Sequence, residues 1–198
     1  IYLECFMDEL AQAAGKDPLE FRRTLMAKHP KALAVLNAVA DKAGWGTPAA
    51  AGVHRGLAVC KAFASYVAAC AEVSVDAKGR VKIHRIVAAT DPGHAVNPQQ
   101  IEAQVEGSFV YGLSAVLYGE CTIKDGAVQQ SNFNDYPSML IDAMPEVETI
   151  IMPWGGFFGG IGVASFAVAS RSVLNGFFAA TGKWFSIFPL MMVSLCSA

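Results

Sequence analysis

Charged residues are scarce in this sequence. Lys, Arg, Asp and Glu make up 16% of its 198 residues, whereas hydrophobic residues make up 54%. Because this charge fraction is low for a free-standing globular domain, we expect the chain to pack against further protein. The net charge of −2 and the lack of a basic run argue against a nucleic-acid interface and against binding to an anionic membrane surface.

The spacing that a metal site needs is also missing. Five scattered cysteines, an odd number without a C-x-x-C motif, argue against a disulfide framework and against a zinc or iron–sulfur site. The four histidines have no ligand spacing either. These residues are Cys5, Cys60, Cys70, Cys121 and Cys196, and His29, His54, His84 and His94. We therefore expect no metal ligand in this segment.

Long apolar runs are absent as well. No stretch reaches the roughly 20 uninterrupted apolar residues of a membrane span, since Gly182, Lys183 and Pro189 interrupt the apolar-rich residues 177–193. The start of the chain has no basic region before an apolar one, so it shows no signal peptide. It opens directly on a helical pattern, and we expect the carboxy-terminal part of a longer protein.

The first 46 residues predict a helical segment that continues from a missing preceding region. Gly15 is a typical C-terminal stop, and Asp17 followed by Pro18 is a typical helix start. Three helices are expected, over residues 3–14, 17–28 and 31–43.

Strand patterns follow, interleaved with helices. Alternation predicts strands over residues 55–63, 65–76 and 81–91, and an apolar run with Val147, Ile150 and Ile151 predicts a strand with mostly buried faces over 144–153. A hairpin turn is expected at residues 124–126. This order predicts an α+β (mixed α/β) fold, with residues 56–198 as one unit.

The first candidate site lies at the start of the helix that follows residues 91–97. Asn97 is a good N-cap, and Pro98 fits the first helical position. Gln104 breaks the apolar run and is soon followed by Gly107, so a polar ligand could approach the backbone there. Alternatively, Gln104 could cap a core contact and Gly107 could allow close helix packing.

The second candidate site is a glycine-rich loop over residues 154–163, WGGFFGGIGV. Five of its ten residues are glycine, and a helix pattern follows it. Such a loop could wrap around a ligand before a helix N-terminus, or it could be a packing loop. It matches neither the G-x-G-x-x-G fingerprint nor a P-loop.

Both stretches resemble the molybdenum hydroxylases, the xanthine dehydrogenase and aldehyde oxidase family. DPGHAVNPQQIEAQVEG resembles the family pattern D-x-G-x-x-x-N-P…Q-x-E-G, whose glutamine hydrogen-bonds the molybdopterin cofactor and falls at Gln104. GGIGVA resembles G-G-x-G-E-P, and LNGFFAATGK behind it is similar to a family string. The similarity runs from about Leu3 to Leu190 and is greatest to the bacterial isoquinoline 1-oxidoreductase and aldehyde dehydrogenase beta subunits.

The resemblance implies the C-terminal part of a molybdopterin-binding large subunit. The cofactor would be molybdopterin with molybdenum, in its cytosine dinucleotide form, and it would oxidise an aldehyde or an N-heterocycle with oxygen from water. Partners would be a small [2Fe–2S] subunit, the N-terminal remainder of the large subunit and a membrane-bound cytochrome c. The location would be the periplasmic face of the inner membrane, otherwise the cytoplasm. The implied cofactor-binding positions are Gln104, Gly107, Gly159, Gly160 and Gly162.

Val163 falls at the position of the family's general base. There the glutamate of G-E-P takes a proton from a metal-bound hydroxide, and valine cannot accept one. Ala164 and Arg171 replace family prolines. Three explanations stay open: the chain is a non-catalytic structural or assembly paralogue, the acid comes from elsewhere, or the gene encodes glutamate. We expect the other nearby acids to be caps, turn residues or surface charges, namely Asp91, Glu102, Glu106, Asp135 and Asp142.

Overall fold

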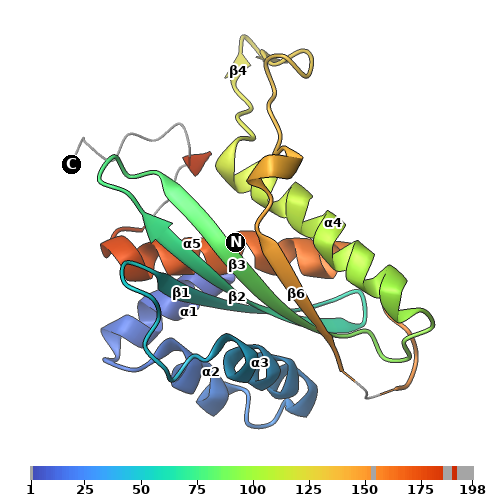
Figure 1. Ribbon diagram of the computed structural model, residues 1–198. Helices are drawn as coiled ribbons and strands as arrows, with labels where there is room; N and C mark the ends of the chain where they lie inside the picture. The colour runs from blue at the N-terminus through green and yellow to red at the C-terminus, as the bar shows by residue number, and fades with distance from the viewer. Residues whose placement is uncertain (1, 153–154, 185–188, 191–198) are drawn as a thin grey trace.

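The computed structural model describes residues 2–152, 155–184 and 189–190 (Figure 1). In chain order its elements are α1 (Tyr2–Ala13), α2 (Pro18–Leu25), α3 (Pro30–Ala43), β1 (His54–Ala62), β2 (Ser65–Val75), β3 (Val81–Asp91), α4 (Pro98–Leu117), β4 (Ile123–Lys124), β5 (Ala127–Val128), the 3₁₀ turn η1 (Ile141–Ala143), β6 (Glu146–Ile151) and α5 (Gly162–Thr181). The predicted mixed α/β class is confirmed.

A four-stranded sheet separates two helical layers. Helices α4 and α5 cover one face and share a core with inward side chains such as Val67 and Ile86. Helices α2 and α3 cover the opposite face, where Leu36 and Val39 pack against Leu57 of the sheet. The predicted division of the chain at residues 46 and 56 stays a prediction.

Strand order is β1-β2-β3-β6, with β1, β2 and β3 antiparallel and β6 parallel to β3. The prediction of mostly buried faces for residues 144–153 was wrong. Strand β6 spans only Glu146–Ile151, and its residues from Val147 onward are half-buried because it forms the edge of the sheet. Helix α4 provides the crossover that a parallel neighbour requires.

The predicted helix starts are confirmed by their caps. Asp17 Oδ1 accepts the N–H of Leu19 at 2.9 Å, and Asn97 Oδ1 accepts the N–H of Gln100 at 3.2 Å. The predicted turn at residues 124–126 joins β4 to β5. Both short strands belong to residues 119–140, here called the arm, which extends away from the sheet and helices (Figure 1).

Helix α5 lies directly on β1 because both elements carry glycine at the contact. A Cβ added at Gly56 would lie 2.0 Å from the backbone nitrogen of Gly176 and 2.2 Å from the carbonyl oxygen of Ser172. By length and hydropathy α5 could cross a membrane, but 61% of its apolar window is buried inside the protein. The buried core helix of a globular protein can have the same length and hydropathy.

A buried ion-pair network lies against the edge strand β1. Glu4 Oε2 accepts the N–H of Val59 at 3.0 Å and the Nε–H of Arg22 at 3.2 Å, and Arg22 also pairs with Asp8. Asn175 of α5 donates to the Glu4 carbonyl oxygen at 3.3 Å. Burial raises the pKa of Asp8 to about 6, against the opposing attraction of Arg22. The network thereby joins α1, α2, β1 and α5.

Candidate functional site

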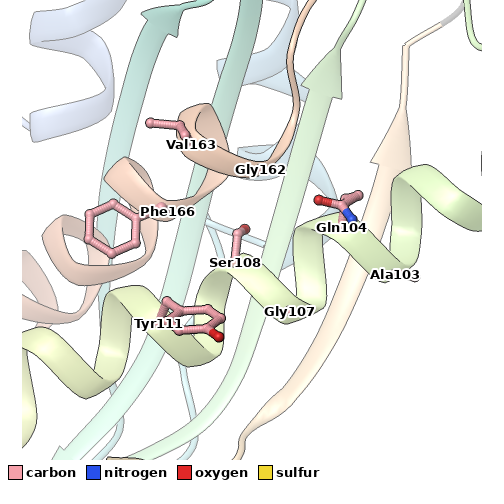
Figure 2. Close-up of a pocket in the computed structure, with 8 residues that line it drawn as sticks. All are labelled: Ala103, Gln104, Gly107, Ser108, Tyr111, Gly162, Val163 and Phe166. Carbon is pink, nitrogen blue, oxygen red and sulfur yellow. The ribbon is translucent and has the colours of Figure 1, made fainter.

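A cavity of about 510 Å³ lies between the first half of α4 and the start of α5 (Figure 2). Two positions predicted on α4, Gln104 and Gly107, line it together with Gly162 and Val163 of α5. The sequence separates these pairs by the arm and β6, and the fold brings them together. The remaining lining residues are Ala103, Ser108, Tyr111 and Phe166.

Helix periodicity decides which α4 side chains reach the cavity. Ile101, Val105 and Phe109 point into the core, so Gln104 and Ser108 lie on another face of the helix. The Ser108 hydroxyl donates to the Val105 carbonyl oxygen at 2.8 Å. The Gln104 amide makes no hydrogen bond to the described residues, which leaves it available to a ligand.

The start of α5 supplies backbone donors on the other side of the cavity. Its N-cap position, Ile161, makes no side-chain cap, and the first N–H groups of a helix have no acceptor within it. A Cβ added at Gly162 would lie 3.2 Å from Gln104 Oε1, so the two helices approach closely there. An added Cβ at Gly107 would meet nothing within 4 Å. Together the Gln104 amide and these N–H groups can hydrogen-bond to oxygen atoms of a ligand.

Gly159 and Gly160 do not line this cavity. Gly159 donates its N–H to Pro92 O at 2.8 Å, and Gly160 donates to Phe63 O at 2.9 Å. A Cβ added at Gly159 would lie 2.4 Å from the Ser65 hydroxyl. In this structure both glycines fix the loop against the β1–β2 turn, so a role in ligand binding stays a prediction for them.

Among the described residues, no acid lines the cavity. Asp91 accepts the N–H of Gly93 at 2.9 Å and lies 3.3 Å from Lys31 Nζ, and Asp135 accepts the N–H of Asn132 at 2.8 Å. The backbone N–H groups of Asn132 and Ser131, which both donate to the Asp135 carboxylate, lower its pKa. Asp135 is a turn residue, as predicted, whereas Asp91 is the buried last residue of β3, which accepts the first turn N–H after the strand and pairs with Lys31. Within the described part of the chain, no group of three or more His, Cys, Asp or Glu residues could hold a metal ion.

Sequence reasoning missed the aromatic part of the cavity wall. Tyr111 follows Gln104 by two helical turns, and Phe166 follows Val163 by almost one, so each lies on the same face as a predicted residue. Helical spacing alone could have found them. Figure 2 shows Tyr111 and Phe166 side by side at one end of the cavity, with Gln104 at the other.

Comparison with known proteins gives one family and several relatives. The sequence family of the molybdopterin cofactor-binding domain matches residues 7–145 of this chain. The beta subunit of isoquinoline 1-oxidoreductase from Brevundimonas diminuta is 26% identical over 94% of this chain and 24% of its own length. A nicotinate dehydrogenase subunit from Pseudomonas putida is 28% identical over 94% of this chain and 17% of its own length. The chain thus spans about a quarter or less of these relatives.

Solved structures show the same fold at lower identity. The match to quinoline 2-oxidoreductase from Pseudomonas putida covers 60% of this chain and 16% of the length of that enzyme's chain. Its TM-score is 0.55 and the sequence identity is 20%. Aldehyde oxidoreductase from Desulfovibrio gigas matches 76% of this chain and 18% of its own, with a TM-score of 0.55 and 18% identity.

Proposed function

Because this chain belongs to the molybdopterin cofactor-binding domain family, we propose that the cavity between α4 and α5 holds part of a molybdenum cofactor. The family is one of oxidoreductases, and the relatives are subunits of such enzymes. The observation that carries the proposal is the meeting of Gln104 and Gly107 with Gly162 and Val163 at one cavity.

The residues present fit the binding of this cofactor. The Gln104 amide can both donate and accept, and the α5 start offers free N–H groups to an oxygen ligand. Neither Gly107 nor Gly162 has a side chain that would fill the space between the helices. When bound, the molybdenum cofactor supplies two-electron oxidation of a carbon centre with oxygen from water.

The finer proposal concerns the substrate and the partners. We propose that the whole protein oxidises aldehydes or N-heterocycles and passes electrons to a small [2Fe–2S] subunit. The names of the relatives, which refer to isoquinoline, nicotinate and aldehyde, support this substrate range. The cytosine dinucleotide form, a cytochrome c partner and a periplasmic location belong to the same proposal and rest on the family resemblance.

Replacement of Gln104 tests the binding role. Gln104→Ala should weaken cofactor binding by about tenfold, as expected for one hydrogen bond to a charged or strongly polar group. Molybdenum content by mass spectrometry and thermal unfolding should be measured together. Gln100→Ala is the matched control, because Gln100 is exposed on the same helix and does not line the cavity. An unchanged molybdenum content in Gln104→Ala would contradict the proposal.

A second candidate function follows from Val163. Its side chain cannot accept a proton and none of the described lining residues carries a carboxylate, which favours a subunit that binds cofactor without rapid hydroxylation. We expect Val163→Glu to raise turnover by about 10²-fold or more, and Val163→Gln, of similar size, to leave it unchanged. Equal rates in the two variants at equal molybdenum content would favour a structural role for this chain.

A further inference from the structure

A second recess, of about 500 Å³, adjoins the cavity. The two share Tyr111 and Phe166 as a common wall. Beyond these rings the recess is lined by Val110 of α4 and by Phe133 and Tyr136 of the arm. One continuous surface therefore leads from the Gln104 amide to a group of four aromatic rings.

Contacts between the arm and α4 hold the far wall in place. The Met139 N–H donates to the Ser114 hydroxyl oxygen at 2.9 Å, and this hydroxyl in turn donates to the Val110 carbonyl oxygen. A Cβ added at Gly119 would lie 3.1 Å from the Tyr136 hydroxyl oxygen, so the Tyr136 ring reaches back to the end of α4. These contacts place the Tyr136 ring against the end of α4.

The lining selects the kind of group that could bind. Its described residues include no Lys, Arg, His, Asp or Glu, so a bound carboxylate or ammonium group would lose hydration and meet only neutral hydroxyls, with no opposite charge to pair with. The Ser114 hydroxyl is already used within the protein. Aromatic rings favour another ring in stacked or edge-to-face contact beyond the gain from buried area alone.

We propose that this recess is a specificity subsite for the neutral aromatic part of a substrate whose reacting end lies beside Gln104. The inference rests on the proposed function, because it takes the first cavity as the place of reaction. It goes further by favouring uncharged aryl substrates over aliphatic and over carboxylated ones. Tyr136 and Phe133 determine this preference.

Direct binding of non-reacting probes to the full chain tests the subsite. Benzamide and cyclohexanecarboxamide are both neutral and similar in size, and benzoate adds a negative charge. We expect benzamide to bind about fivefold more tightly than cyclohexanecarboxamide, and benzoate to bind more weakly than either, by titration calorimetry. Tyr136→Leu and Phe133→Leu should each reduce the aromatic preference to less than about twofold.

Tyr2→Leu is the control, since Tyr2 is 80% exposed on α1 and does not line the recess. Phe133 is 91% exposed, so its replacement tests binding even if Tyr136→Leu fails to fold. No preference for benzamide, or the same preference in both arm variants, would show that the recess is only a packing surface. Molybdenum content, measured in the same samples, separates this failure from failure of the proposed cofactor site.

Discussion

At the scale of single residues, Arg22 carries a full charge into the interior, where Glu4 and Asp8 neutralise it. Its side chain is 1% exposed. Arg22→Leu would leave two buried carboxylates without a cation, and we expect the free energy of unfolding to fall by about 3–5 kcal/mol. Arg23→Leu is the control, because Arg23 pairs with exposed Glu20 and donates to Asn37 Oδ1, so its loss leaves no buried charge unpaired and should cost only about 1 kcal/mol. Chemical denaturation measures both, and similar losses would contradict a central role for the network.

The Asp8 carboxyl in this network gives stability a specific pH dependence. Its pKa rises from 3.8 to about 6 on burial, so the folded protein binds the proton more tightly than the unfolded chain. The contribution of protonated Asp8 is therefore fully present below about pH 4 and is lost as the pH rises through about 6. Asp8→Asn should lack this decline when urea unfolding is compared between pH 4 and pH 7. A decline of the same size in the variant would assign it to another group.

At the scale of secondary-structure elements, the contact between β1 and α5 depends on a missing side chain. Gly56→Ala would place a methyl group against the α5 backbone, which has no freedom to rotate away. We expect a loss of about 3 kcal/mol in stability or more. Gly46→Ala serves as control, since a Cβ there meets nothing within 4 Å. If thermal unfolding is equal for the two variants, the close packing of α5 on β1 is not a determinant of stability.

The elements themselves could largely be predicted from local chemistry. Asp17 and Asn97 mark helix starts because their side chains satisfy backbone donors within the next three residues. The position of β6 could not be predicted in this way, because pairing with β3 depends on the whole α4 crossover. Nor could the Gly56 contact or the Arg22 network, which join segments far apart in the chain. Periodicity gave the cavity face of α4, but only the family resemblance linked Gln104 to Val163.

At the scale of the whole molecule, several large apolar side chains remain exposed on the surface. Tyr2 of α1, Ile141 of η1 and Phe157 of the glycine loop are each at least 80% exposed. Such exposure, in a chain that spans a quarter or less of its relatives, indicates a surface covered by further protein. We expect the isolated chain to self-associate in size-exclusion chromatography with light scattering. A monodisperse, cooperatively unfolding monomer would contradict this.

The cavity has walls from two helices that are synthesised at different times. Helix α4 is complete well before α5, and β6 must pair with β3 between them. A nascent chain that ends before Gly162 therefore has Gln104 in place but no opposing wall. On the proposed function, cofactor loading would follow synthesis and docking of α5, and would therefore be a late step in maturation. Any delay in α5 docking would then slow loading without altering the affinity of the finished site.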